Sequence, residues 1–326
     1  MIAGVGRALE EAGMAPADVS ILIHGTTLAT NAIIERKGAK IALLTTEGHR
    51  DSVEMALENR FEQYDINIDR PPPLAPRQLR WTVRERMNVA GDPLIPLDEA
   101  SVEAVLPLIA KHGIEALAVG LLHAYANPAH EARVKEIVQA AYPDLPISIS
   151  SDVCPEIREY ERTSTTTINA YVKPVVASYL ANLRQGLDAA GVEAELLLMQ
   201  SNGGLISAET AARLPMNIIE SGPAGGVVGA RFVAELAGIG DVLTFDMGGT
   251  TAKASMVEGG RYARADDFEV GGGILAGSRL LTGAGYLLKT QAIDLAEVGA
   301  GGGSLVWIDA GGALQIGPES AGADPG

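Results

Sequence analysis

The stretch that most constrains the fold is 242–257, which reads VLTFDMGGTTAKASMV. An apolar run ends at Asp246, passes through two glycines and two threonines, and resumes as an alternating segment up to the turn at 258–260. This pattern predicts a β-hairpin, because paired glycines adopt positive φ at little steric cost. Its tip would gather main-chain N–H groups, hydroxyls and one carboxylate, which a polyphosphate and its magnesium ion require. We therefore predict that ATP and Mg²⁺ bind here, although a plain hairpin turn would use the same glycines. The candidate phosphate-binding residues are Gly248, Gly249, Thr250 and Thr251.

The two commoner phosphate loops are absent from the sequence. A Walker loop needs GxxxxGK[ST] running into a helix, and a dinucleotide fold needs GxGxxG between a strand and a helix. Neither string occurs in the chain. In the predicted hairpin the glycines lie between two strands, with Asp246 at the exit of the first. This is the arrangement of the actin, Hsp70 and sugar-kinase class.

A second candidate phosphate turn, SGPAGG, occupies 221–226. The sequence predicts that it joins an apolar strand at 217–219 to a helix that ends near Leu236. Ser221 is placed to cap this helix and Pro223 suits its first turn. Unpaired N–H groups at a helix start attract anions, so we expect the turn to line the nucleotide site. The alternative is that its glycines only let the helix pack closely on the sheet. The glycines concerned are Gly222, Gly225 and Gly226.

The periodicity of apolar residues predicts an α/β fold. Short apolar runs alternate with helical stretches, which is typical of a largely parallel sheet. The predicted strands are 21–25, 40–46, 116–122, 147–151 and 196–200, and the predicted helices are 28–38, 97–113, 127–142 and 165–185. We expect Pro174 to kink or break the last of these helices. A chain of 326 residues favours two domains, and we predict a boundary near 160.

Composition narrows the classes of function. The net charge of −16 argues against a nucleic-acid partner, because such binding depends on a basic face. The single cysteine, Cys154, allows no internal disulfide and no multi-cysteine metal cluster, which fits a reducing compartment. The first residues do not have the pattern of a signal peptide, and no window has 18 uninterrupted apolar residues. We therefore expect a cytoplasmic protein without a membrane partner.

Polar residues follow three of the predicted strands. If these strands were neighbours, their carboxyl ends would meet at the edge where α/β proteins bind ligands. Two readings compete at this edge: a divalent metal held by His49, Asp51 and His123, or hydrogen-bonded structural histidines and a helix-capping aspartate. The candidate substrate-binding residues here are His24, Thr26, Thr27 and His49.

The segment 155–171 carries a cluster of charges. Arg158 and Arg162 are neighbours at helical spacing and could together bind a carboxylate substrate. The alternative is a solvated charged helix face on which Arg158 pairs with Glu161. Arg158 therefore joins the candidate substrate residues.

Several motifs together resemble the hydantoinase A/oxoprolinase family, and they cover nearly the whole chain in the family's order. They are HGTTLATNAIIERKGAKIALLTTEGHRD, PEIREYERTSTTTINAYVKP, MQSNGGL, ESGPAGGVVGA, TFDMGGTTAKAS and GPESAGADPG. The resemblance implies the two-lobed actin-like ATPase fold of acetate and sugar kinases, Hsp70 and actin. It also implies a cytoplasmic enzyme in a hetero- or homo-oligomer with a hydantoinase B-type subunit.

The resemblance divides the chain into the family's N-terminal domain, 1–160, and its ATPase-like domain, 161–326. The family's first lobe normally opens with its own Asp-x-Gly-Gly-Thr turn, which is missing here. We therefore expect a fragment whose first lobe is truncated at the N-terminus and whose second lobe is incomplete at the C-terminus. Lys253 stands where family members often carry Asp, which would bring a positive charge towards the phosphates.

The activity that the resemblance implies is ATP-dependent opening of a cyclic amide, a hydantoin or 5-oxoproline, through phosphorylation of its carbonyl oxygen. Asp246 and Thr250 would be the catalytic residues, with Asp246 orienting Mg²⁺ through water. One alternative is the β subunit of an acetone- or acetophenone-type carboxylase. Another is an actin- or Hsp70-like module that binds ATP without catalysis.

Overall fold

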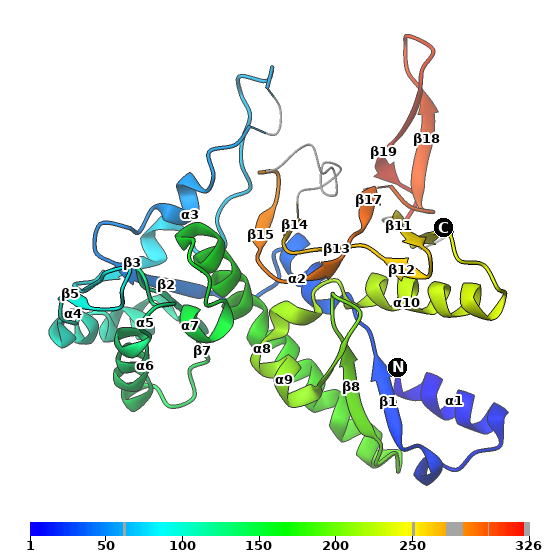
Figure 1. Ribbon diagram of the computed structural model, residues 1–326, viewed down its shortest axis with the longest axis horizontal. Coiled ribbons are helices and arrows are strands. Elements are labelled where there is room, and N and C mark those ends of the chain that lie inside the picture. Colours follow the sequence, from blue (N-terminus) through cyan, green and yellow to red (C-terminus); the bar gives the residue numbers. More distant parts are fainter. Residues whose placement is uncertain (61–62, 250–251, 272–282, 299, 323–326) are drawn as a thin grey trace.

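The computed structural model describes residues 1–60, 63–249, 252–271, 283–298 and 300–322 (Figure 1). Its first sheet is four-stranded and parallel, in the order β3 (Arg80–Val83), β2 (Ile41–Thr46), β6 (Ala116–Gly120) and β7 (Ile147–Ile149). Every residue of β2 is buried, because helices cover both faces of the sheet. This arrangement explains why the central strands read as continuous apolar runs.

Each face of this sheet has its own helices and its own core. One face packs against α4 (Glu99–Glu103), α5 (Leu106–His112) and α6 (Ala129–Ala141). The other face packs against α8 (Glu159–Ala189), which also forms part of the core of the second sheet. Figure 1 shows α8 extending from the first sheet to β8 and α9.

The second sheet is built from distant segments. β1 (Ile21–His24) pairs in parallel with β8 (Glu195–Met199), which pairs antiparallel with β9 (Leu205–Ser207). Residues of α1 (Ile2–Ala12), α2 (Leu28–Ile34) and α9 (Ala208–Arg213) belong to the same hydrophobic core as this sheet or pack against it. β1 is therefore not a neighbour of β2 or β6.

The third sheet contains the hairpin of β10 (Val242–Met247) and β11 (Ala252–Glu258), with β12 (Arg261–Tyr262) and β17 (Ala296–Val298) paired to β11. The helix α10 (Ser221–Leu236) packs against it.

Short elements complete the described structure. The small strand pairs are β4–β5 (Arg86–Met87, Pro93–Ile95), β13–β16 (Arg264–Ala265, Ala292–Ile293), β14–β15 (Phe268–Val270, Tyr286–Leu288) and β18–β19 (Ser304–Ile308, Leu314–Ser320). The short helices are α3 (Ser52–Met55), α7 (Ser150–Val153), η1 (Pro16–Asp18), η2 (Arg77–Leu79) and η3 (Pro215–Ile218).

The structure corrects four local predictions. The expected strand at 217–219 is largely the 3-10 helix η3, and residues 150–151 begin α7 instead of extending β7. The expected helix at 97–113 consists of two helices, α4 and α5. Of the two outcomes expected at Pro174, a break is wrong, because α8 spans 31 residues from Glu159 to Ala189 with Pro174 inside it. The hydroxyls of Thr165, Thr166 and Thr167 donate to carbonyls four residues earlier in α8, so these three buried groups are satisfied within the helix.

No helix in the described ranges is both long and apolar enough to cross a membrane.

Candidate nucleotide site

The predicted hairpin is confirmed, with Asp246 directly opposite Lys253 in the antiparallel register of β10 and β11. The main-chain carbonyls of Gly248 and Gly249 accept hydrogen bonds from the amides of Gly302 and Gly303, each at 2.9 Å. The loop before β18 therefore holds this part of the tip. The other two candidate phosphate-binding residues, Thr250 and Thr251, lie outside the described residues.

The turn after β1 lies directly against the start of α10. The Thr26 amide donates to Ser221 Oγ at 3.0 Å, and that hydroxyl donates to the Thr26 carbonyl at 2.8 Å. A Cβ placed on Gly222 would lie 3.2 Å from Cγ2 of Thr27. The prediction that Ser221 caps α10 is wrong, because Glu220 is the N-cap residue and no side-chain cap bond forms. Ser221 instead links the turn at 25–27 to the first turn of α10 through these two hydrogen bonds.

Asp246 lies over the same first turns of α10. A Cβ placed on Gly226 would be 3.7 Å from Oδ2 of Asp246, and one placed on Gly225 would be 3.9 Å from Cγ of Met199. The Asp246 side chain is exposed although its strand packs on α10. Segments 25–27 and 246–249 thus both lie against the start of α10, at 221–226. These three turns consist mainly of glycine and other small residues. The geometry suits a ligand that approaches main-chain amides closely.

A buried ion cluster lies beside these turns. Lys253 Nζ is 2.5 Å from Glu220 Oε2 and 3.5 Å from Glu297 Oε1, and Lys253 is 8% exposed. Burial acts to lower the pKa of Lys253, but the two carboxylates outweigh it and the pKa is raised. Burial raises the pKa of Glu220, against the opposing effect of Lys253. The expectation that Lys253 directs its charge towards phosphates is wrong: its ammonium is engaged by Glu220 and Glu297, two residues that sequence reasoning did not single out.

The structure does not place the three predicted histidines at one sheet edge. His24 is on the second sheet, where its Nε2 lies 2.7 Å from the Tyr179 hydroxyl, and burial lowers its pKa. His49 Nε2 lies 2.9 Å from Nη1 of Arg86, and burial, followed by the charge of Arg86, lowers its pKa. The expected single site of His24, His49 and their neighbours is therefore divided between two sheets.

The predicted metal site is not formed by the described residues. Asp51 accepts two hydrogen bonds from Arg77, at 3.1 and 3.0 Å, and one from Arg80. His123 Nδ1 lies 3.3 Å from the hydroxyl of Tyr125. Within the described ranges, no three or more His, Cys, Asp or Glu side chains gather in a way that could hold a metal. His49 and Asp51 follow β2, and His123 follows its parallel neighbour β6, but Asp51 is paired with Arg77 and Arg80 and the three side chains do not form a metal site.

Arg158 and Arg162 do not form a carboxylate clamp. Arg158 is exposed and pairs with Glu161 at 3.2 Å, as the alternative reading expected. Arg162 is fully buried and donates to Ser150 Oγ and to the carbonyls of Glu156 and Leu121. Through these hydrogen bonds Arg162 connects α8 to α7 and to the end of β6.

Comparisons with known proteins agree with this architecture. The hydantoinase/oxoprolinase family profile matches residues 162–326, and the profile of the family's N-terminal region matches residues 1–142. The chain belongs to the hydantoinase/oxoprolinase family. Its α/β fold matches the crystal structure of the ATP-dependent caprolactamase from Pseudomonas jessenii with a TM-score of 0.82 at 36% identity, covering 99% of this chain and 46% of that one. Nucleotide-free acetone carboxylase matches with a TM-score of 0.80 at 28% identity, covering 96% and 44%.

Sequence relatives of this family member carry several activities. An uncharacterized protein of Methanocaldococcus jannaschii is 41% identical over 99% of this chain and 48% of its own. Caprolactamase subunit alpha of Pseudomonas jessenii is 35% identical over 99% and 45%, and 5-oxoprolinase 1 of Arabidopsis thaliana is 31% identical over 98% and 25%. The chain thus spans about half the length of the first two relatives and a quarter of the third.

Proposed function

We propose that the chain binds ATP at the three converging turns and uses it to activate a carbonyl group, most simply for hydrolytic opening of a cyclic amide. The observation that carries this proposal is the juxtaposition of the hairpin, the Thr26–Thr27 turn and the start of α10 around Asp246 and Gly226. A strand-turn-strand tip next to a glycine-rich helix start supports an actin-like ATPase fold, and relatives described as ATP-dependent support the use of ATP.

The chemistry explains why ATP would be needed. An amide carbonyl is a poor electrophile, and phosphorylating its oxygen gives an imidate phosphate that water can attack. Phosphoryl transfer depends mainly on positioning and on neutralising charge. In this proposal the main chain at Gly248, Gly249, Thr250 and Thr251 holds the phosphates, and the glycines of 221–226 line the nucleotide site. Mg²⁺ would neutralise phosphate charge, and Asp246, an exposed carboxylate at the strand exit, would orient it through water.

The first test is nucleotide binding by calorimetry, with and without magnesium, on the native chain and on Asp246→Asn. We expect Asp246→Asn to lose the magnesium-dependent part of the affinity and to lower turnover by at least about tenfold. Unchanged magnesium-dependent binding and unchanged turnover in this variant would remove Asp246 from the assignment. A matched control is Asp241→Asn, which changes a carboxylate at the other end of the same strand, where it accepts a hydrogen bond from the Gly259 amide.

The alternative function, a subunit of an ATP-dependent carboxylase, also has support. The acetone carboxylase β subunit of Xanthobacter autotrophicus is 30% identical over 98% of this chain. In that reading the same activation produces an enol phosphate, which reacts with bicarbonate. Incubating the complex with ATP and either a lactam or a ketone with labelled bicarbonate separates the two readings. Ring-opened amino acid supports hydrolysis, and labelled carboxylate supports carboxylation. If ATP turnover responds to neither class of substrate, the chain is a non-catalytic ATP-binding module.

We further propose that the chain works as one subunit of an oligomer with a hydantoinase B-type partner, in the cytoplasm. Names such as caprolactamase subunit alpha support a multi-subunit assembly. We also retain the two-domain division at 160/161, which falls within the first turn of α8; β1 pairs with β8 across this division. Co-expression with a B-type subunit, followed by pull-down, tests the partner.

A further inference from the structure

One face of the third sheet carries a row of three charged residues. Asp246 on β10 lies directly opposite Lys253 on β11, and Lys253 lies directly opposite Glu297 on β17. Residues that are directly opposite in an antiparallel pair direct their side chains to the same face of the sheet. This face is the one that packs on α10, because the Asp246 carboxylate lies close to Gly226 and Lys253 reaches Glu220, the N-cap residue of α10. One ammonium group therefore shares the face with three carboxylates.

Asp246 and Lys253 are close enough to form an ion pair. The Cβ atoms of directly opposite residues are about 4.5–5.5 Å apart, and opposite charges in these positions attract one another. A lysine ammonium is carried on a flexible four-carbon stem, so it can reach the opposite carboxylate. Among the residues that the structure describes, however, Lys253 forms ion pairs with Glu220, at 2.5 Å, and Glu297, at 3.5 Å, and Asp246 takes part in neither.

The surroundings of the two glutamates explain this choice of partner. The side chains of Glu220 and Lys253 are each 9% exposed, so water and salt weaken their attraction little. Glu220 is also held at its main chain, where its amide donates to Ser201 Oγ at 3.3 Å. Glu297 supplies a second carboxylate on the neighbouring strand. Asp246 is exposed, so its attraction for the ammonium is more strongly screened.

We propose that Glu220 and Glu297 are positioning residues, which engage the ammonium of Lys253 and thereby leave the Asp246 carboxylate open to a divalent cation. Without them the ammonium would turn to Asp246, the third carboxylate of this face, and compete with Mg²⁺ for it. This inference rests on the proposed role of Asp246 in magnesium-dependent nucleotide binding. It adds that two residues outside the phosphate-binding turns keep that role available.

The test measures binding of adenylyl imidodiphosphate, a non-hydrolysable ATP analogue, by calorimetry at pH 8 with and without magnesium. Glu220→Gln combined with Glu297→Gln should weaken binding of the magnesium complex at least about tenfold, because Mg²⁺ must then displace an ammonium from Asp246. Binding without magnesium should not weaken, since two negative charges near the phosphates have been removed. A merely structural role of the glutamates would instead weaken both, through displacement of α10.

A third substitution and a matched control identify the cause. Adding Lys253→Met to the double variant should restore most of the affinity for the magnesium complex, because no ammonium is left to occupy Asp246. The control is Glu99→Gln with Glu136→Gln. These two carboxylates also hold one cation, Arg133, at 2.8 and 2.9 Å, but they belong to α4 and α6 at the first sheet. The control changes the net charge equally and should leave both affinities at their native values.

The outcomes distinguish this inference from the ATP proposal. If magnesium does not increase the affinity of the native chain, the role of Asp246 fails and the inference fails with it. If magnesium increases it and Asp246→Asn abolishes the increase, but the double variant binds the magnesium complex like the native chain, the positioning role alone is overturned. Equal losses with and without magnesium, or a loss that Lys253→Met does not reverse, also overturn it.

A milder variant decides the question if the double variant does not fold. The Glu297 side chain is 21% exposed, so Glu297→Gln by itself should keep the fold. We expect it to weaken binding of the magnesium complex about twofold or more, as loss of a partly exposed ion pair would. Native affinity in this folded variant would count against a role for Glu297 in holding the ammonium away from Asp246, and would refute the proposal.

Discussion

Replacing Lys253 by methionine should destabilise the protein in a strongly pH-dependent way. The substitution keeps an unbranched apolar stem but removes the ammonium that lies 2.5 Å from Glu220 Oε2. Removing one partner of a buried ion pair costs about 3–5 kcal/mol, because the remaining charge is left uncompensated in a poorly solvated place. Glu220 is 7% exposed, whereas Glu297 is more exposed and further from the ammonium. We therefore take the lower figure, about 3 kcal/mol at pH 8.

The effect should shrink in acid, because Glu220 can then take up a proton. Burial raises the pKa of Glu220 in the folded chain above its ordinary value of 4.5. A carboxyl group with a raised folded pKa binds more protons when folded, so stability decreases as pH rises from the unfolded pKa through the folded one. Below this window the variant loses only a hydrogen bond, about 1 kcal/mol. Lys253→Met removes the charge and hydrogen bond that act to lower the pKa of Glu220, so this pKa rises further in the variant and the penalty should grow between pH 5 and pH 8.

Urea unfolding followed by circular dichroism at several pH values measures this penalty. Lys135→Met is the matched control, because Lys135 pairs with Asp152 at 3.7 Å with both side chains partly exposed, and such pairs contribute about 0–1 kcal/mol. Adding Glu220→Gln to Lys253→Met should recover most of the lost stability, because no uncompensated charge remains. A loss no greater than that of Lys135→Met, or one that is the same at pH 5 and pH 8, would refute the reasoning.

Three further predictions concern individual residues. Gly25→Ala should destabilise the protein by about 1–3 kcal/mol, since the new Cβ would lie 3.1 Å from the Ser221 carbonyl oxygen. Gly229→Ala places its Cβ in open space at a helical position and should stabilise the protein by about 0.5–1 kcal/mol. Thermal unfolding of both variants checks this. Because burial lowers the pKa of His24, the folded chain binds fewer protons there, so stability should fall as pH drops below 6.5; NMR titration should place this pKa below 6.5, and His24→Gln should reduce the acid sensitivity. Burial raises the pKa of the Cys154 thiol to about 11, so iodoacetamide at pH 8 should label the native protein at least about 100-fold more slowly than the urea-unfolded chain, as mass spectrometry would show.

The elements that sequence patterns predicted best are those fixed by local chemistry. The hairpin at 242–258 follows from an apolar run, paired glycines and an alternating run, all within a short segment. β2 was recognised because burial on both faces demands a continuous apolar run. The short run at 217–219 was misread, since its two apolar residues, Ile218 and Ile219, fit a strand or a helical turn equally well.

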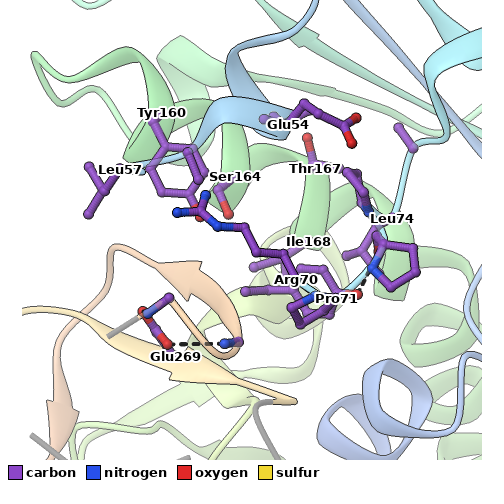
Figure 2. A pocket seen from close by; sticks show the side chains of 18 of the residues that line it. Glu54, Leu57, Arg70, Pro71, Leu74, Tyr160, Ser164, Thr167, Ile168 and Glu269 are labelled. Atoms are coloured by element: carbon purple, nitrogen blue, oxygen red, sulfur yellow. Dashed lines mark hydrogen bonds between the residues drawn. The ribbon is translucent and has the colours of Figure 1, made fainter. Parts of the chain in front are cut away.

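The sequence alone did not predict which strands and side chains lie next to one another in the folded chain. His24 was grouped with His49 because both follow apolar runs, yet β1 pairs with β8, which begins at Glu195. The Lys253 cluster is equally non-local, since Glu220 precedes α10 and Glu297 lies on β17. A cavity of about 260 Å³ draws its walls from α3, α8 and residues 69–75 (Figure 2), and no single motif marks it.

The placement of Lys253 also decides how charge must be balanced at the candidate nucleotide site. The turns at 25–27, 221–226 and 246–249 contain no lysine or arginine, and the ammonium of Lys253 is held by two carboxylates. The exposed charge at these turns is the carboxylate of Asp246, in a chain with a net charge of −16. Main-chain amides contribute only partial charges, so they cannot by themselves offset a triphosphate. We therefore expect nucleotide binding to require a divalent cation, and substitution of Lys253 to affect the position of α10 more than the charge that the phosphates meet.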